Sequence, residues 1–542
     1  MNRLLRLSAL MLTAVLASCS ARGAETRDPD MVICGWIAGP DSLNPLTTIG
    51  STGKMIQDSI FTPLVAIAPN QLPRWETSLA KRIDITDSGK RYVIHLRRAQ
   101  WSDGKPLTAR DVVFTIKLSN NHAVLQPLTS DFGLMTSVRM LDPYTVEIRL
   151  SRPSPPFLTN ALGQILPLPE HILGKYPADS EEQAKFINTD AAFSRDPVVS
   201  GPWRVLHQVP DSYLVLERNP RYWGPQPYIP RIAFRVYPQQ DSLYAALDAN
   251  EIDVTDIPPN LWRIHGRLRG NHKAVNWPWN VTFYLLPNFR HPQAPFLHEL
   301  AVRQAMMHAI DRKFIIDGIM SGQADLLDGP IPRFSPHYDK SIFKYTYDPK
   351  RARELLEAAG WHLSGNAREK NGVRLRITLK TGGATDAVAS NIAELIQANL
   401  RAIGIDCILQ NEEISTFFAD VNKSNFQLAL RGKILNPYPD DYYLFDSSQT
   451  KQNGGRNAGF YANPAADRAI EAARTAATPE EARKALNDWQ EIAARDLPAI
   501  FLYSNRLGAL VPADMTGFEL NPNAPAALPM GLEFWRRTGR NP

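Results

Sequence analysis

The residues with the most potential for chemistry are one histidine–glutamate pair and one pair of aspartates. His298-Glu299 would open a zinc-binding His-Glu-x-x-His helix, but position 302 is valine. Asp440 and Asp441 are adjacent on the chain, which points their side chains apart rather than toward a shared acid–base site. The sequence also lacks a Gly-x-Ser-x-Gly elbow, a Walker loop and a dinucleotide fingerprint. We therefore expect no catalytic residues, no metal ligands and no cofactor, and a protein that is not an enzyme.

Two other groups of side chains are suited to binding a ligand without changing it. Ser51 and Thr52 lie in a turn of small residues and can hydrogen-bond an extended ligand; the alternative is that they cap the helix that follows. Trp277 and Trp279 flank a proline, and on a strand they would face the same side. They could cover a ligand or form core between two domains, and both interpretations remain open.

Helices and strands must alternate to position these side chains. The segment 295–316 predicts an amphipathic helix, because apolar residues recur on one face at Val302, Ala305, Met306, Ala309 and Ile310. Further helices are expected at 347–360 and 389–403, with strands at 375–380, 405–410 and 425–430, a pattern typical of an α/β layer. Earlier in the chain, Thr108 and Asp111 predict a helix start with a capping box.

The N-terminal residues predict an export signal. Arg3 and Arg6 precede an apolar run at 7–16, which is too short to span a bilayer, and then comes Leu-Ala-Ser-Cys ending at Cys19. This phrase is similar to a bacterial lipobox, which implies a signal peptide at 1–19 and a diacylated Cys19 that tethers the protein to a membrane. The alternative is an ordinary cleaved signal with a chance cysteine.

Charge and cysteine content narrow the class further. The 60 basic and 55 acidic residues leave a net charge of +5, and two of the arginines lie in the leader. No cluster of basic and aromatic residues suggests a nucleic-acid partner. Export places Cys34 and Cys407 in an oxidising compartment, where they could pair. Their placement in strands of distant lobes favours two buried free thiols instead.

Two phrases of the sequence show a family resemblance. These are GKRYVIHLRRAQWSDGKPLTARDVVFT at 89–115 and VRQAMMHAIDR at 302–312. They resemble the solute-binding proteins of bacterial ABC importers, in the branch that includes oligopeptide, dipeptide and nickel-chelate binders. Weaker matches in the family's order extend the resemblance from about residue 31 to residue 503.

The resemblance implies a fold and a division into lobes. The fold is α/β and periplasmic-binding-protein-like (type II, cluster C), with two large lobes, an extra subdomain and a hinge. Lobe I would comprise 20–63, 196–283 and 496–542, lobe II (the extra subdomain) would comprise 64–195, and lobe III would comprise 284–495. The crossings between lobes I and III are expected near residues 283 and 496.

The resemblance also implies a function. The protein would capture a peptide or other small solute between its lobes and deliver it to an ABC permease in the inner membrane, acting as a lipid-anchored monomer in the periplasm or cell envelope. The alternatives are a binder of metal chelates or glycoconjugates with the same fold, or an envelope lipoprotein that serves signalling or cell-wall recycling rather than transport.

Specificity is expected in the run from 431 to 442. Peptide-binding relatives have an aspartate near this position that pairs with the ligand's ammonium, usually after a Gly-Trp phrase. Here Lys433 replaces the tryptophan, and the simplest register puts Asn436 at the aspartate's place, although a shifted register could use Asp440 or Asp441. An uncharged amide cannot offset a buried ammonium. The ligand-binding residues expected in this run are Arg431, Asn436, Tyr438 and Asp440.

Overall fold

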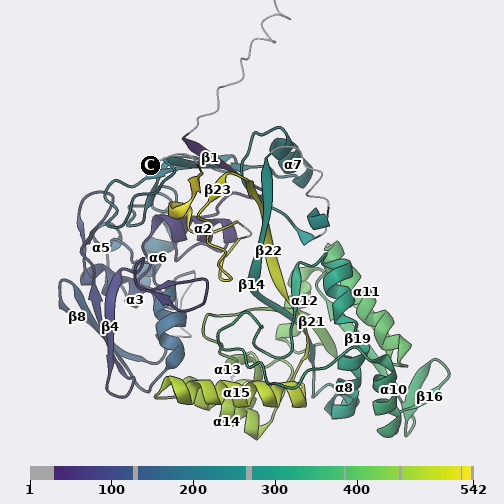
Figure 1. Ribbon diagram of the computed structural model, residues 1–542. Coiled ribbons are helices and arrows are strands. Elements are labelled where there is room, and N and C mark those ends of the chain that lie inside the picture. Colours follow the sequence, from purple (N-terminus) through teal and green to yellow (C-terminus); the bar gives the residue numbers. More distant parts are fainter. Residues whose placement is uncertain are drawn as a thin grey trace, which may run out of the picture.

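Two long paired strands, β14 (His272–Pro287) and β22 (Ile500–Pro512), run side by side through the middle of the molecule and connect its parts (Figure 1). This computed structural model describes residues 30–125, 132–259, 261–263, 271–383, 386–450, 455–526 and 528–538. The predicted signal peptide and Cys19 lie outside the described residues. Within them, no helix is both long and apolar enough to cross a membrane.

At one end of the two long strands lies a four-stranded sheet built from segments far apart in the sequence. Its order is β1 (Met31–Trp36), β12 (Arg231–Val236), β11 (Tyr213–Arg218) and β10 (Trp203–Val209), with β1 parallel to β12. Cys34, which the sequence places in a strand, lies in β1. Helix α2 (Ser51–Ile60) follows β1 and begins at Ser51, so Ser51 and Thr52 lie in its first turn rather than before it. Helix α7 (Gln240–Asp248) and the short β13 (Thr255–Asp256) complete this region.

A second four-stranded sheet, antiparallel throughout, falls within the range predicted for lobe II. Its order is β4 (Ala80–Thr86), β5 (Arg91–Leu96), β9 (Thr145–Leu150) and β8 (Met135–Asp142). Helix α3 (Ala109–Ser119) packs against it, and the predicted capping box at the start of α3 is confirmed by reciprocal hydrogen bonds between Thr108 and Asp111. The π-helical turn η1 (Phe157–Ala161) and α6 (Glu181–Thr189) follow.

The remaining residues form a mixed sheet covered by helices. Its order is β13-β22-β14-β21-β19-β20, with β19 (Arg376–Thr381), β20 (Asp406–Asn411) and β21 (Leu428–Ile434), while β15 (Ala324–Leu326) pairs with β22. Among the helices of this region are α8 (Leu300–Ala309), α10 (Pro349–Ala358), α11 (Ala387–Ala402), α12 (Ile414–Asn422), α13 (Tyr442–Phe445), α14 (Pro464–Thr475) and α15 (Pro479–Asp496). The apolar face predicted for the helix near 302–310 is confirmed, since all five of its residues are at most 1% exposed.

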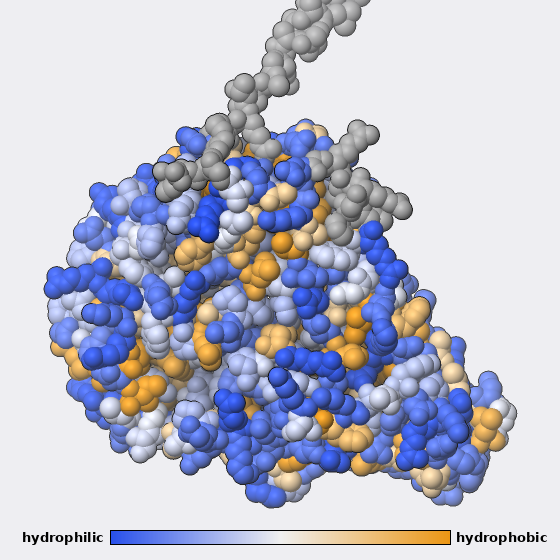
Figure 2. Space-filling model, viewed as in Figure 1, coloured by the Kyte–Doolittle hydropathy of each residue, from blue (hydrophilic) through white to orange (hydrophobic). Residues whose placement is uncertain are grey.

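One sheet therefore runs continuously from the first region into the third, because the long strands β14 and β22 are part of this sheet in both regions. The predicted boundary at 283/284 falls inside β14, and the boundary at 495/496 falls at the last residue of α15, before β22 begins. The lobe limits stay predictions, and we use the lobe names for the ranges given above. On the face shown in Figure 2, hydrophilic side chains dominate and hydrophobic ones gather in small separate patches.

The two cysteines that lie in the described residues are free and buried, as the sequence favours. Cys34 lies in β1 and packs in the core of lobes I and II, whereas Cys407 lies in β20 in the core of lobe III. Burial raises the pKa of the Cys407 thiol to about 12 and holds the pKa of Cys34 well above its usual value. Neither thiol is therefore activated as a nucleophile.

Candidate functional site

A cavity with a volume of about 460 Å³ lies where the three predicted lobes meet. Lobe I contributes one face of α2 and the C-terminal segment 519–533. Lobe II contributes residues between 65 and 77, including Arg74, one side of α3 and the region of η1. Lobe III contributes the four residues 434–437 at the end of β21. This volume is within the range of about 300–1,000 Å³ that is typical of small-molecule sites. The three lobes must be close together for such a cavity to exist.

Asn280 in β14 connects two of the segments that line the cavity. Its side-chain amide donates to the carbonyl of Leu435 (2.9 Å), and the N–H of Leu435 donates to the carbonyl of Asn280 (2.7 Å). The N–H of Asn280 donates to the carbonyl of Pro522 in the C-terminal segment (2.9 Å). Because Asn280 is only 8% exposed, these bonds are shielded from water and fix the two segments to the long strand.

Lobes II and III contact each other across the cavity through Asn160 and Tyr438. The side-chain amide of Asn160, in η1, donates to the carbonyl of Tyr438 (2.9 Å), and the N–H of Tyr438 donates to the amide oxygen of Asn160 (3.0 Å). Both residues are buried. We call this pair of bonds the Asn160–Tyr438 contact. It holds the two lobes in a closed arrangement.

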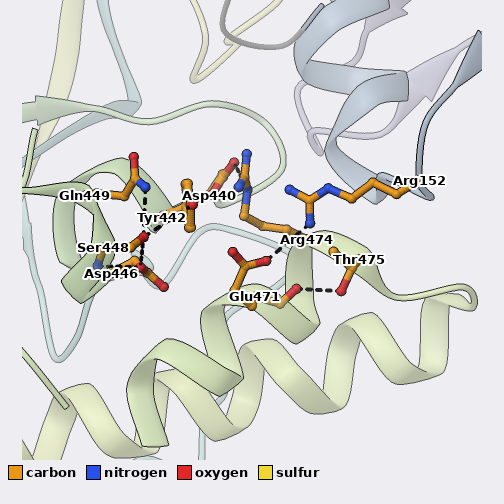
Figure 3. A network of polar contacts seen from close by, with 9 residues as sticks. All are labelled: Arg152, Asp440, Tyr442, Asp446, Ser448, Gln449, Glu471, Arg474 and Thr475. Atoms are coloured by element: carbon orange, nitrogen blue, oxygen red, sulfur yellow. Dashed lines mark hydrogen bonds and ion pairs between the residues drawn. The ribbon is translucent and has the colours of Figure 1, made fainter. Parts of the chain in front are cut away.

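A second contact between these lobes is more exposed. Arg152, which follows β9, faces Glu471 on α14 with a nitrogen–oxygen distance of 3.3 Å (Figure 3). Their side chains are 35% and 41% exposed, so solvent screens the pair and its contribution is small. The Asn160–Tyr438 contact is therefore the stronger of the two connections.

The cavity lining contains two cationic and three acidic side chains. Lys54 and Asp58 lie one turn apart on the same face of α2, which is the spacing that places helix side chains next to each other. Arg74 forms an ion pair with Glu519, and Glu533 lies in the turn that ends the C-terminal segment. None of these charges comes from the lobe III residues that line the cavity.

Two of these carboxyl groups are strongly perturbed. The Asp58 side chain is exposed at the cavity surface, but desolvation by the protein around it raises the pKa of Asp58 from 3.8 to about 7 against the opposing effect of Lys54. Burial likewise raises the pKa of Glu533 to about 7; the charge of Glu519 adds to the shift and Arg74 opposes it. The enclosed cavity thus disfavours two uncompensated negative charges.

Residues 431–442, which we expect to set specificity, have different surroundings in the structure, and only some of them line the cavity. Asn436 lines the cavity, whereas Tyr438 belongs to the contact with Asn160 and donates its hydroxyl to the carbonyl of Ala473 (2.8 Å). Asp440 accepts a hydrogen bond from Arg474 (2.9 Å; Figure 3). Arg431 lies within β21, opposite Tyr284, and its Nε has no hydrogen-bond partner within the described part of the chain.

Asp441, the other aspartate considered for the ammonium, is also engaged within the protein. It forms an ion pair with Lys433 and accepts a hydrogen bond from Trp489 Nε1 (2.8 Å). Since both aspartates have internal partners, Asn436 is the candidate of the three that lies on the cavity. Its amide has no charge to offset an ammonium.

The other predicted binding residues lie outside the cavity lining. Ser51 and Thr52 occupy the first turn of α2, where Thr52 donates its hydroxyl to the carbonyl of Gly39 (3.0 Å) and Gly50, not a hydroxyl residue, is the N-cap. Trp277 is 1% exposed and belongs to the core of lobes I and II. Trp279 packs against that core and donates its Nε1–H to the carbonyl of Ala524 (3.1 Å) in the C-terminal segment. Their role in ligand binding stays a prediction.

The charged residues of the cavity were missed by the sequence analysis. Lys54 and Asp58 do show a signal, because their spacing puts two charges on one face of a helix next to the candidate binding residues Ser51 and Thr52. Glu519 and Glu533 show none. They follow the last long strand in a segment with little regular structure, and only the fold brings them to α2.

A cavity enclosed by lobes that two long strands connect is the architecture of a solute-binding protein of the two-lobed class. Residues 74–456 match the family model described as bacterial extracellular solute-binding proteins, family 5 Middle. The chain therefore belongs to the bacterial extracellular solute-binding proteins of family 5. The resemblance in the sequence and the predicted fold class are thereby confirmed.

Individual relatives cover nearly the whole chain. The oligopeptide-binding protein AppA of Bacillus subtilis is 28% identical over 538 residues, which is 96% of each chain. The nickel-binding periplasmic protein of Escherichia coli is 28% identical over 443 residues, or 79% of this chain and 80% of that protein. The solved structure of B. subtilis AppA in complex with a nonapeptide has a TM-score of 0.73 at 26% identity, covering 94% of this chain and 99% of that one. The structure of NikZ from Campylobacter jejuni with Ni(L-His) has a TM-score of 0.74 at 24% identity, covers 94% of this chain and 100% of that one, and supports the fold alone.

Proposed function

We propose that this chain is the substrate-binding component of an ABC importer, which captures a peptide or peptide-like solute between its lobes and delivers it to a membrane permease. The observation that supports this best is the cavity of about 460 Å³ lined by three lobes, two of which touch through the Asn160–Tyr438 contact. Affinity would arise from desolvation of the solute in the closed cavity. Release would require the permease to favour an open arrangement of the lobes.

The proposal includes attachment at the membrane. A lipid on Cys19 would keep the protein in the cell envelope beside the permease, and it would act there as a monomer. The chain up to residue 30 then serves as a tether between the lipid and β1. Binding and release need no bond-making, which agrees with a protein that is not an enzyme.

A metal chelate is the second candidate solute, because relatives of this chain include nickel-binding proteins. Among the described residues, those that line the cavity include no histidine and no cysteine. Within the described ranges, no group of three or more His, Cys, Asp or Glu residues could hold a metal ion. A bound metal would therefore have to arrive with its own ligands, as part of a chelate.

Native mass spectrometry of the chain without residues 1–19 tests the proposed function. We expect an extra mass after purification that disappears on mild denaturation and refolding and returns when the solute is added back. The refolded protein would then be titrated with tripeptides, nickel–histidine and a muropeptide. A protein that carries no extra mass and binds none of these would contradict the transport function and favour a non-transport envelope role.

A further inference from the structure

We propose that the solute is an organic cation, a basic peptide or a polyamine, and that Asp58 and Glu533 on the lobe I side of the cavity bind its charged groups. This inference rests on the proposed function, because it assigns a chemical class to the solute of the same cavity. It differs from the expectation from the sequence, which placed charge recognition in lobe III.

The first observation is that neither carboxylate has a side-chain partner in the described residues, although the backbone N–H of Glu533 hydrogen-bonds its own carboxylate. Asp58 and Glu533 line the cavity, and no other side chain in the described residues hydrogen-bonds or forms an ion pair with either. Glu519 differs, because Arg74 already neutralises it. Asp58 is exposed and Glu533 is half-buried, so a solute in the cavity can reach both, and each carboxylate is stabilised when a cation or a proton joins it. A cationic solute supplies that partner.

The second observation is the distribution of charge over the three lobes. The one cation that lobe II adds to the described lining is Arg74, which is paired with Glu519, and the lobe II lining near η1 is neutral, with residues such as Thr159 and Gln164. The lobe III lining is Ile-Leu-Asn-Pro, so neither lobe supplies an unpaired cation to the two carboxylates. Lys54 is the one cation of the lining without an ion-pair partner among the described residues, and it cannot offset both acids.

The third observation separates an organic cation from a metal ion. Described residues nowhere bring three metal-binding side chains together, and Glu533 has Glu519 and Arg74 rather than further free ligands beside it. A divalent ion needs about six oxygen ligands, which two carboxylates do not provide. Ammonium and guanidinium groups, by contrast, form charge-assisted hydrogen bonds with single carboxylates.

Calorimetric titration with solutes of similar size and different charge tests the proposal. The probes are Lys-Ala-Lys, Ala-Ala-Ala, Glu-Ala-Glu and spermidine, each at pH 8 and fixed ionic strength. We expect Lys-Ala-Lys or spermidine to bind at least about tenfold more tightly than Ala-Ala-Ala, which is the gain from a single charge-assisted hydrogen bond. Glu-Ala-Glu should not bind. Spermidine binding alone would assign a polyamine, and Lys-Ala-Lys binding alone would assign a basic peptide.

Isosteric variants locate the effect. Asp58→Asn and Glu533→Gln should each weaken binding of the cation by about tenfold or more and leave binding of Ala-Ala-Ala unchanged. Lys54→Gln removes the opposite charge from the same helix face and should strengthen cation binding. Glu182→Gln, at an exposed position of α6 outside the cavity lining, is the matched control and should change nothing.

The pH dependence gives an independent readout. Because the pKa values of Asp58 and Glu533 are about 7 in the empty cavity, binding a cation should release protons near neutral pH, and affinity should rise from pH 6 to pH 8. Lys54 is the charged group that acts on Asp58, while Arg74, Glu519 and the Tyr222 hydroxyl act on Glu533. The proton release should disappear in the Asn and Gln variants.

The outcomes distinguish the two proposals. Equal binding of neutral and cationic peptides, or full cation affinity in both variants, would overturn the charge assignment and leave the transport function standing. If the wild-type chain bound no solute of any charge and carried no extra mass, the proposed function would fail and this inference with it. Circular dichroism and thermal unfolding establish that each variant is folded before its affinity is compared.

Discussion

Replacing Asn160 with alanine should weaken solute binding by loosening the closed arrangement. The Asn160 amide makes two buried hydrogen bonds to the backbone of Tyr438, one in each direction, at 2.9 and 3.0 Å. A hydrogen bond of this kind contributes about 0.5–1.5 kcal/mol net, so losing both would cost the closed state about 1–3 kcal/mol. Since a tenfold change in an equilibrium corresponds to about 1.4 kcal/mol, the apparent Kd should rise roughly 5- to 150-fold.

The chain offers a closely matched control for this variant. Asn188 in lobe II also uses its amide for two backbone bonds, to the carbonyl of Ala123 at 2.9 Å and from the N–H of Leu125 at 3.0 Å. Both partners belong to lobe II, so Asn188→Ala removes the same number of backbone bonds, here exposed rather than buried, without affecting the contact between lobes. We expect its solute affinity to match the wild type.

Isothermal titration with the tightest-binding solute measures the affinity, and small-angle scattering measures the radius of gyration with and without that solute. Asn160→Ala should require a higher solute concentration to reach the compact form, whereas Asn188→Ala should not. Wild-type affinity in Asn160→Ala would refute the reasoning, because it would show that the Asn160–Tyr438 contact does not stabilise the closed arrangement. An equal loss in both variants would also refute it, since the loss would then reflect lobe II stability.

Three further predictions concern stability and thiol chemistry. Between about pH 4 and 7 the folded chain retains a proton on Asp58 that the unfolded chain has released, so wild-type stability falls as pH rises over this range. Asp58→Asn should therefore raise the melting temperature at pH 8 and change it little at pH 4. An equal shift at both pH values would contradict the assigned pKa. Asp441→Asn leaves the Lys433 ammonium without its buried partner and should lower the free energy of unfolding, measured in urea, by about 3 kcal/mol. Adding Lys433→Gln to the same chain should recover part of this loss. No recovery would argue against the ion pair as the cause. In the chain without residues 1–19, Cys34 and Cys407 should react with a thiol reagent only after denaturation, and a disulfide found by mass spectrometry would contradict the two buried free thiols.

Local patterns predicted the elements of this fold because each depends on residues close in the sequence. The apolar face of α8 and the capping box at Thr108 and Asp111 are examples, and both are present in the structure. The strand predicted at 425–430 extends to Ile434, so Arg431 lies in β21 rather than in the loop that follows. Periodicity could not fix that end, because Arg431, Gly432 and Lys433 interrupt the apolar pattern.

The site was harder to predict because it forms between segments that are distant in the sequence. Asn436 was identified through the resemblance, but the partner of Asn160 could not be predicted, since the two residues that make that contact are 278 positions apart. For Trp277 the difficulty is different, because the sequence identifies the residue but not its role. An aromatic residue on a strand between lobes is equally suited to core and to ligand contact, and only its 1% exposure identifies it as core.

Closure and charge recognition act on different parts of the binding equilibrium. A solute can shift the lobes toward the closed arrangement only by binding that arrangement more tightly than the open one. The Asn160–Tyr438 contact stabilises the closed arrangement by the same amount for every solute, so it raises all affinities together. Asp58 and Glu533 act differently, because enclosing them without a cation requires them to take up protons, and a cation removes that cost. In a chain with both Asn160→Ala and Asp58→Asn, the two losses in binding free energy should therefore add for a cationic solute, while a neutral solute should show only the loss from Asn160→Ala.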